Sequence, residues 1–372
     1  MARRNQVSER NGARVMVKRM SAGFCVILGV VAPALGQSQP AAPAPEGVES
    51  DWLRDIRQIT TAAMGIDKAG EAYFSPDGKR ICFQATPTGK EDYQIYVMNL
   101  SGGAPEMVST GKGATTCSFF SPDGTKLLFA SNHLDPRPAD LPPESKNDKS
   151  GRNYAWSFFP GMDIFEYSFA TRALKRLTDA EGYDAEGSYS PDGKLIIFTS
   201  MRDGDQEIYI MDVDGKNPRR ITSAKGYDGG PFFAPDGKRI VYRSDRKGDG
   251  NLQIFTNTID GKSEHAITGN DVLNWCPFWH PSGKWLIYTR ADHNAKDGPP
   301  NYDLYLIRDD GSQLTRVTYD PKFDGLPVFS PDGKRVMWTS KRGGLQEAQV
   351  FVADFVGLTA AGELLGPVRN KR

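Results

Sequence analysis

The sequence predicts an all-β fold, a six-bladed β-propeller whose blades are four-stranded antiparallel sheets. Three observations lead to it. A hairpin motif occurs six times, its copies are about one blade apart, and an outer strand that is absent after the last copy is present before the first. Repeats of forty-odd residues in strand-rich sequence are typical of propellers and solenoids.

The hairpin motif is best seen in "YFSPDGKRICF" at 73–83. Proline presets φ for the first turn position, Asp suits the second, and Gly accepts the positive φ that closes the turn. The spacings between successive copies are 46, 69, 44, 46 and 50 residues, and the long one holds an insertion. The hairpin prolines are Pro76, Pro122, Pro191, Pro235, Pro281 and Pro331.

The third repeat shows the whole unit. Strands are expected at 187–190, 195–200, 207–213 and 219–223, separated by short turns. The second of these begins with four consecutive apolar residues and the third alternates, as expected for inner strands of a half-buried sheet. Each repeat is therefore predicted to be one meander of four strands.

The closure of the ring is predicted at the N-terminus. No fourth strand follows the last third strand at 349–355, whereas "IRQITT" at 56–61 has the character of the other fourth strands. A ring left open would expose two sheet edges. The N-terminal strand is therefore expected to complete blade 6. In the alternative, the C-terminal tail completes it and 56–61 forms a lid or tail.

The chain is expected to divide into four parts. Residues 1–36 have a basic start, a short apolar run and a small residue at Gly36, as in a cleavable signal peptide. A Pro/Ala-rich linker at 37–50 precedes the propeller at 51–355, which carries an insertion at 132–160 in blade 2, and 356–372 is a tail. The protein is expected to be periplasmic or secreted and not membrane-spanning after cleavage. An uncleaved anchor helix is the alternative.

Charge and cysteines exclude some functions. Without residues 1–36 the chain has a formal charge of −5, so a nucleic-acid partner is not expected. Cys82, Cys117 and Cys276 have no zinc-ligand spacing and are interpreted as buried small side chains, with one disulfide left open.

The repeats resemble the TolB-like propeller family, WD-like repeats with a Pro-Asp hairpin. The resemblance rests on the hairpins, on the loop "SMRDG" at 200–204, on the turn "MDVDG" at 211–215, and on the "LT" and "GYD" segments that follow. It covers about residues 51–355 and implies a propeller like the C-terminal one of TolB, without its N-terminal domain. It also implies an exported protein that binds envelope proteins.

The loops of one face are the expected recognition surface. The hairpins on one face are uniform, whereas the opposite face carries the insertion and a long loop at 289–301. Variable loops on a rigid scaffold are common recognition sites. The predicted contact residues there are Trp156, Phe158, Trp275 and His293. In the alternative, the aromatic side chains of the insertion only pin it to its blade.

A second series lies seven residues before the hairpin prolines, at the expected channel mouth. These residues could bind a divalent cation or a basic segment, or they could only stabilise tight connections by accepting backbone hydrogen bonds. Recurrent arginines in nearby loops could pair with them. The predicted site residues are Asp184, Asp228, Asn274, Asp324, Arg202, Arg246 and Arg342.

No catalytic motif is present. The sequence has no G-x-S-x-G elbow and no phosphate-binding or dinucleotide fingerprint. The preferred interpretation is a monomeric, non-enzymatic propeller that presents one face to a cell-envelope protein or extended segment, without a cofactor apart from a cation at the mouth. The alternative is a metal- or ligand-dependent glycan lyase or hydrolase that uses the same mouth.

Overall fold

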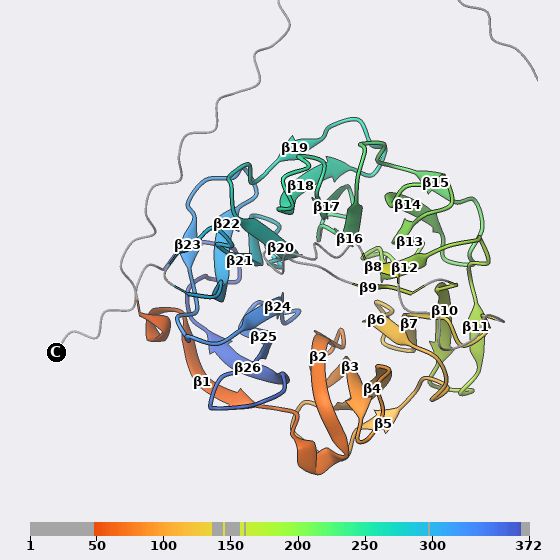
Figure 1. Cartoon of the computed structure of the whole chain (residues 1–372), viewed down its shortest axis with the longest axis horizontal. Coiled ribbons are helices and arrows are strands. Elements are labelled where there is room, and N and C mark those ends of the chain that lie inside the picture. Colours follow the sequence, from red (N-terminus) through yellow and green to blue (C-terminus); the bar gives the residue numbers. More distant parts are fainter. Residues whose placement is uncertain (1–47, 136–143, 146–156, 160, 297, 366–372) are drawn as a thin grey trace, which may run out of the picture. The chain divides into compact units, whose positions relative to one another are not determined.

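The structure is a computed structural model that describes residues 48–135, 144–145, 157–159, 161–296 and 298–365. The expected signal peptide, most of the linker and much of the insertion lie outside these ranges. The described part forms six four-stranded antiparallel sheets arranged around a central axis (Figure 1). The predicted all-β, six-bladed fold is confirmed.

The six blades follow one another in sequence order. Blade 1 contains β2 (Ile66–Phe74), β3 (Arg80–Pro87), β4 (Gln94–Asn99) and β5 (Glu106–Met107). Blade 2 contains β6 (Thr115–Phe120), β7 (Lys126–Ser131), β10 (Asp163–Ser168) and β11 (Leu174–Arg176). Blade 3 contains β12 (Asp184–Tyr189), β13 (Leu195–Ser200), β14 (Glu207–Asp212) and β15 (Arg219–Arg220). Blade 4 contains β16 (Asp228–Phe233), β17 (Arg239–Ser244), β18 (Gln253–Thr258) and β19 (His265–Ala266).

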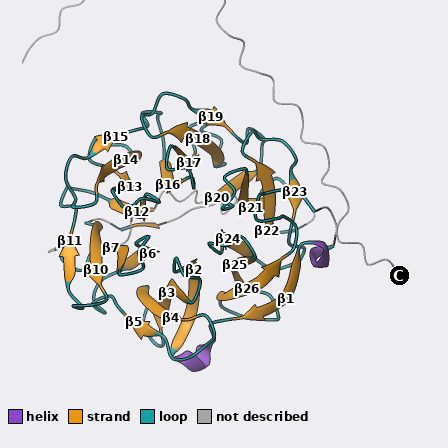
Figure 2. Ribbon diagram, turned by 180° about the vertical axis from the view of Figure 1, so that it is seen from behind, coloured by secondary structure: helices purple, strands orange, loops and turns teal. Residues whose placement is uncertain are grey.

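The last two blades complete the ring. Blade 5 contains β20 (Leu273–Trp279), β21 (Trp285–Ala291), β22 (Tyr302–Arg308) and β23 (Thr315–Arg316). Blade 6 contains β24 (Asp324–Phe329), β25 (Arg335–Ser340), β26 (Gln349–Phe355) and β1 (Leu53–Gln58). A small hairpin of β8 (Glu144–Ser145) and β9 (Ser157–Phe158) belongs to the insertion. The first strand of blades 1 to 5, and β24 in blade 6, lines the axis (Figures 1 and 2).

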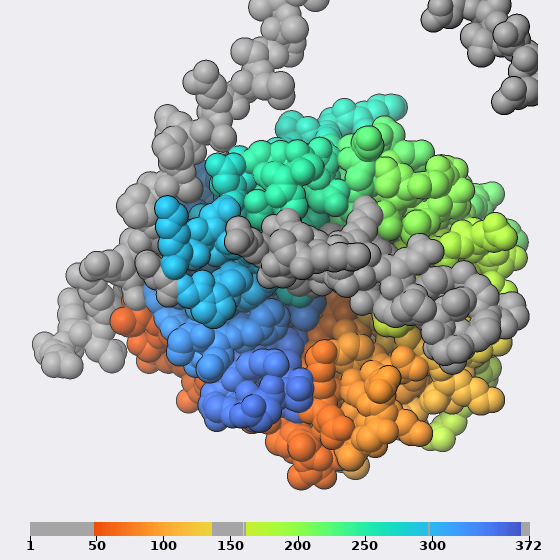
Figure 3. Space-filling view, viewed as in Figure 1, coloured from red at the N-terminus to blue at the C-terminus, as the bar shows by residue number. Residues whose placement is uncertain are grey.

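The N-terminal strand closes blade 6. β1 pairs antiparallel with β26, and the first described residues lie beside the last blade (Figure 3). The strand covers Leu53–Gln58 rather than the predicted 56–61. Asp55 has a φ of 51°, and the register of the pair shifts between Arg54 and Arg57. Trp52 and Leu53 lie in the core of blade 6.

A hydroxyl clamp explains why 56–61 resembles the other fourth strands. In each blade a Thr or Ser just after the outer strand accepts a hydrogen bond from a backbone N–H of the third strand. The Ile208 N–H donates to Thr222 Oγ1 at 2.9 Å in blade 3. The Val350 N–H donates to Thr60 Oγ1 at 2.9 Å in blade 6. The N-terminal segment therefore carries the same clamp as a blade made from continuous chain.

The repeated hairpin is held by its own side chains. In blade 1, Ser75 Oγ donates to Asp77 Oδ1 at 2.5 Å, and the Lys79 N–H donates to the same oxygen at 3.1 Å. The motif's Ser and Asp thus satisfy each other and the turn backbone, which leaves them a structural role.

Helix is almost absent from the described part. Its two 3-10 turns are η1 (Glu49–Asp51) and η2 (Ala62–Met64). Across the described ranges, no helix has the length and apolar character to cross a membrane.

Candidate functional site

Each innermost strand is interrupted by a β-bulge at the same place. The pairing of the first and second strands shifts between Gly70 and Tyr73 in blade 1, and between Ala185 and Ser188 in blade 3. Equivalent shifts occur in the other four blades. A bulge leaves a residue without a partner and turns its side chain. Six bulges around one axis therefore present six residues to the channel, five of which carry a side chain.

The bulged residue lies five positions before the hairpin proline and always has a left-handed backbone. Its φ ranges from 45° to 59°. Five of the six are not Gly, although this conformation costs roughly 1–2 kcal/mol for other residues. Conformations of this kind are found more often at functional sites. The six residues are Glu71, Cys117, Glu186, Gly230, Cys276 and Leu326.

All six bulged residues line a cavity of about 550 Å³ in the channel. Its mouth is formed by blade connections and by second-to-third loops, including Tyr93 and Phe323. Most of its lining is apolar, and Trp275 and Phe159 contribute aromatic surface. The volume lies in the range of small-molecule and side-chain pockets.

An aromatic cluster forms the floor of this cavity. Tyr73, Phe119, Phe232 and Phe278 come from equivalent positions in four blades, three residues before the hairpin proline. Ring centroids are 5.3 Å apart for Tyr73 and Phe119, and 5.1 Å apart for Phe232 and Phe278. The same four residues also border a second, smaller cavity of about 250 Å³ on the hairpin side. The rings therefore separate two cavities along one axis.

Glu186 is the carboxylate with the most partners. Arg243 Nη2 donates to Glu186 Oε1 at 2.5 Å, and the Gly230 N–H donates to Glu186 Oε2 at 2.8 Å. The Tyr227 hydroxyl donates to Oε2 at 2.9 Å and Thr199 Oγ1 donates at 2.7 Å. A Cβ atom at position 230 would overlap Arg243, so Gly at this bulge makes room for the guanidinium.

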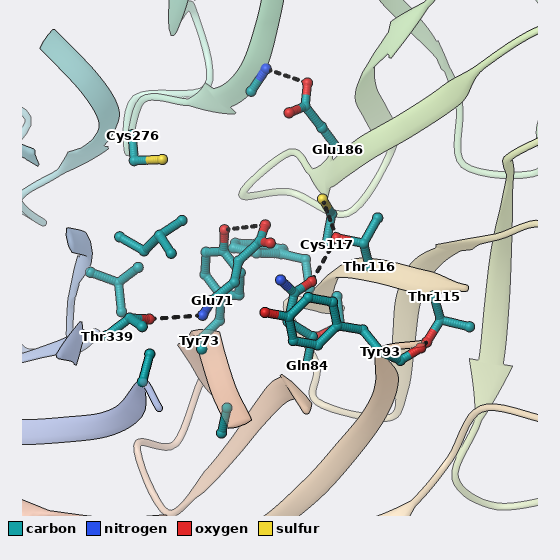
Figure 4. A pocket seen from close by; sticks show the side chains of 18 of the residues that line it. Glu71, Tyr73, Gln84, Tyr93, Thr115, Thr116, Cys117, Glu186, Cys276 and Thr339 are labelled. Carbon is teal, nitrogen blue, oxygen red and sulfur yellow. Dashed lines mark hydrogen bonds between the residues drawn. The ribbon is translucent and has the colours of Figure 1, made fainter. Parts of the chain in front are cut away.

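Glu71 is the contrasting carboxylate. Its backbone N–H donates to Thr339 Oγ1 of blade 6 at 3.0 Å, and its carboxylate accepts a long hydrogen bond of 3.4 Å from the Tyr73 hydroxyl (Figure 4). Burial raises the pKa of Glu71 to about 7, a hydrogen bond with Cys117 lowers it, and the charge of Glu186 raises it further. The group can therefore change its protonation state near neutral pH.

Two thiols face the same space. Glu71, Cys117, Glu186 and Cys276 come from four blades and converge on the cavity (Figure 4). All three described cysteines are free, and Cys82 is fully buried beside the channel. Burial raises the pKa of the Cys117 and Cys276 thiols well above the ordinary value. Protonated thiols are weak nucleophiles, so these two act as soft lining groups.

The predicted aspartates at the mouth are buried in ion pairs instead of lining the cavity. Each pairs with the arginine of its own blade: Asp184 with Arg202 at 3.0 Å, Asp228 with Arg246 at 3.0 Å, and Asp324 with Arg342 at 2.6 Å. Burial raises the pKa of all three carboxyls, and the arginine in each case lowers it. A divalent cation there would have to displace an arginine. Partner binding by these six residues stays a prediction.

Aspartate and arginine occur together in this series. In blade 5 the equivalent residue is Asn274, whose amide donates to Gln253 Oε1 at 3.0 Å. In blade 2 it is Thr115, and His133 takes the place of the arginine beside Ser131. Aspartate is thus present only in the blades that also have the arginine. This is expected if the ion pair stabilises the connection into its blade.

The remaining predicted residues have different positions. Trp275 lines the cavity. His293 lies in its loop, with Nε2 2.9 Å from the Tyr302 hydroxyl, and does not line it. Trp156 lies outside the described residues, and for Phe158 only the backbone is described, in β9. Their role in binding stays a prediction.

The cavity residues were missed by sequence reasoning because it followed the charged series seven residues before the proline. The informative column is two residues later, where the copies read Glu, Cys, Glu, Gly, Cys and Leu. The signal that could have found them is a position that varies from copy to copy at a fixed distance, five residues, before the proline of a nearly uniform hairpin. Over the described ranges, no three His, Cys, Asp or Glu side chains form a metal-binding group.

The comparisons with known proteins agree with the fold. Residues 160–297 match the PD40 family, described as the TolB beta propeller domain. An uncharacterized protein of Agrobacterium fabrum is 34% identical over 167 residues, which are 39% of this chain and 55% of that protein. A TolB homolog of Chlorobium luteolum is 28% identical over 154 residues, which are 37% of this chain and 35% of that protein. The chain thus matches little more than half of one curated relative and about a third of the other.

Solved structures share the propeller. A putative TolB from Agrobacterium tumefaciens has a TM-score of 0.56 and 22% identity, covering 82% of this chain and 99% of that one. An oligogalacturonate lyase from Vibrio parahaemolyticus has a TM-score of 0.50 and 16% identity, covering 80% and 93%. At these identities the likeness is one of fold. Together with the family match, it shows that this chain carries a TolB-like β-propeller.

Proposed function

We propose that this protein is an exported, non-enzymatic binding propeller that holds an extended segment of a cell-envelope protein at its loop face. The site is the 550 Å³ cavity and its mouth. Export is inferred from the signal-like residues 1–36. The TolB-like fold supports a protein partner in the envelope, and the protein would act as a monomer without a cofactor.

The closed floor of the cavity is the observation that carries this proposal. Four packed rings block the channel, so a ligand can enter the cavity only from the loop face. Apolar walls with a few convergent polar groups suit a protruding side chain of an extended segment, whose backbone would lie across the mouth. Blade connections around the mouth differ from one another, which allows selectivity.

Site-directed photo-crosslinking in the exporting cell tests the proposal. A photoreactive residue in place of Tyr93 or Phe323 lies at the mouth of the cavity. The same residue in place of Lys262, which is exposed in a turn on the opposite face, is the control. We expect the two mouth positions to capture one envelope protein through a short segment, which peptide mapping identifies.

Capture of the same protein from Lys262, or no envelope protein from either mouth position, contradicts the proposal. Aspartates 228 and 324 are poor choices for this test. They are fully buried in ion pairs, so their replacement would unfold the blade connections and abolish binding indirectly.

One observation favours the enzyme alternative. A carboxyl group with a pKa of about 7 in a cavity suits general acid or base catalysis. Hydrolysis of a glycosidic bond ordinarily requires a second carboxyl group, and Glu186 is already neutralised by Arg243. Incubation with acidic and neutral oligosaccharides, followed by ultraviolet and reducing-end assays, decides this. Turnover that is lost in Glu71→Gln would replace the binding proposal with the enzymatic one.

A further inference from the structure

The charged groups of the cavity are unevenly matched. Seven charged residues of the described part line it, and four of them, Lys68, Glu91, Asp92 and Lys341, lie toward the mouth, with two charges of each sign. The three deeper groups are Glu71, Glu186 and Arg243. Two carboxylates and one guanidinium leave a deficit of one positive charge when both acids are ionised.

Glu71 is the deep carboxylate that lacks a countercharge among the described residues. Arg243 is committed to Glu186, with side chains only 12% and 10% exposed. In the described part of the chain no Lys or Arg forms an ion pair with Glu71, and its side-chain contacts are Tyr73 and Cys117. Lys68 lies over the ring of Tyr93 at 4.9 Å, and Lys341 Nζ donates to the backbone oxygen of Gln346 at 2.9 Å.

The backbone holds the Glu71 carboxylate in this position. Its φ of 45° is unfavourable for Glu, and the hydrogen bond from its N–H to Thr339 ties the bulge to the neighbouring blade. Gly70 is required beside it, because a Cβ there would lie 2.9 Å from Thr339 Oγ1. An aromatic floor lies next to the carboxylate, and ring faces attract cations.

We propose that the cavity binds an organic cation, a primary ammonium or guanidinium group on an apolar body, with its charge against Glu71 and its body on the aromatic floor. Among the described residues the only deep base is Arg243, which Glu186 already neutralises, so an anion would lack a partner there, whereas a cation completes the charge balance. The inference deepens the proposed function in one respect: the cation can be a Lys or Arg side chain of the bound segment. A free amine is the other source of the same chemistry.

Calorimetric titration with 2-phenylethylammonium tests the proposal at pH 8, with the purified mature protein. The neutral 2-phenylethanol and the anionic 3-phenylpropionate are matched in size. We expect the ammonium compound to bind at least tenfold more tightly than either. Glu71→Gln should lower its affinity at least tenfold, whereas the control Glu181→Gln, an equal change at an exposed residue of a blade connection that does not line the cavity, should leave it within twofold.

The pH dependence gives a readout that needs no variant. Because the pKa of Glu71 is about 7, a cation must compete with a proton at lower pH. Affinity for 2-phenylethylammonium should fall about tenfold from pH 8 to pH 6 in the wild type and remain flat in Glu71→Gln. Equal binding of the alcohol, tighter binding of the anion, or an affinity unaffected by Glu71→Gln overturns the proposal.

The two proposals fail separately. If a segment is crosslinked at the mouth but the ammonium compound does not bind, the cation site is wrong and the binding function stands. If the compound binds through Glu71 but no segment is captured, the cation site stands with a free amine as its ligand. If the captured segment carries a Lys or Arg and 2-phenylethylammonium competes with it, the segment is the source.

Discussion

At the scale of single residues, the molecule separates acids that fasten the fold from an acid that is left available. Asp184, Asp228 and Asp324 are matched one to one with arginines and close the connections between blades. Glu71 has no such base among the residues that the structure describes, and it is held in an unfavourable backbone conformation. A buried carboxyl group that lowers the stability of the fold and has no ion-pair partner is typical of a functional site.

Glu71→Gln is predicted to stabilise the protein at pH 8 and to change its stability by less than about 1 kcal/mol at pH 5. The folded-state pKa, about 7, lies above the ordinary value of 4.5, so the folded state binds this proton more tightly than the unfolded state. That stabilisation is complete below pH 4.5 and is lost as the pH rises through 7. Gln removes the loss, which we expect to be about 3 kcal/mol at pH 8, because each pKa unit corresponds to about 1.4 kcal/mol.

Thermal unfolding of both proteins at pH 5 and pH 8 measures this effect. Glu181→Gln is the control, since its side chain is exposed and should not change the unfolding temperature at either pH. A lower unfolding temperature for Glu71→Gln at pH 8 would show that the charged carboxylate stabilises the folded state and would contradict the prediction.

The sequence revealed half of this residue-scale arrangement. The pairing of recurrent aspartates with recurrent arginines follows from their common spacing, and the structure shows which partner each one takes. The cavity could not be read in the same way. Which side chains enter the channel depends on the bulge, and a bulge at Glu or Cys has no marker comparable to Gly in a turn.

At the scale of elements, the bulged inner strand is the device that builds the cavity. A regular strand would send alternate side chains into the neighbouring blades. The bulge turns one residue per blade toward the axis, and each blade can use it differently. In blade 4 the bulged residue is Gly230, which has no side chain, so Arg243 from β17 can reach Glu186 of blade 3.

Gly230→Ala is predicted to lower stability more than an equivalent change elsewhere. The φ of Gly230 is 59°, and a Cβ would displace the Arg243 guanidinium and separate it from Glu186. Breaking a buried pair in this way typically costs about 3–5 kcal/mol. Gly78→Ala is the matched control, because Gly78 has a φ of 66° and no atom near its missing Cβ. Its cost should be only the backbone term, about 1–2 kcal/mol.

Urea denaturation of both variants compares the two costs. Equal losses in Gly230→Ala and Gly78→Ala would mean that the guanidinium relocates freely and that the Glu186 pair adds nothing to stability.

Strand boundaries show a second limit of sequence reasoning at this scale. The pair Ile59 and Thr60 correctly indicated that an outer strand lies nearby, because Thr60 is the hydroxyl clamp of blade 6. The same pair misplaced the strand, since it follows β1 instead of lying inside it. The clamp and the strand are separate features that occur next to each other in every blade.

At the scale of the whole molecule, closure depends on contacts between the two ends of the described chain. β1 pairs with β26, the Thr60 hydroxyl donates to Gln349 Oε1 at 2.7 Å, and Arg342 pairs with Glu49 of η1 at 2.9 Å. These contacts all belong to blade 6, so paired strands, and not a loop alone, connect the two ends of the described chain. Six repeats with one offset were enough to predict this arrangement, because an open ring would leave two edges.

Removal of residues 1–61 is predicted to open the ring. β26 would become an exposed edge with unpaired backbone groups, and such edges associate with one another. We expect a large fall in unfolding temperature together with dimers or aggregates in light scattering after size-exclusion chromatography. A chain that begins at Val48 retains η1, β1 and the clamp, and is the control. A monomeric truncation with an unchanged unfolding temperature would show that β1 is not required for closure.

The closure of blade 6 also determines when its outer strand can pair during synthesis of the chain. Thr60 and its partner Gln349 are 289 residues apart, so β1 leaves the ribosome long before the strand with which it pairs. At ribosomal rates of about 5–20 residues per second this delay is roughly 15 to 60 seconds. Five blades can form within that interval, but β1 remains without its sheet until the end. During biosynthesis, the same pairing that removes the last edge from the finished ring leaves its first strand available to chaperones and to neighbouring chains.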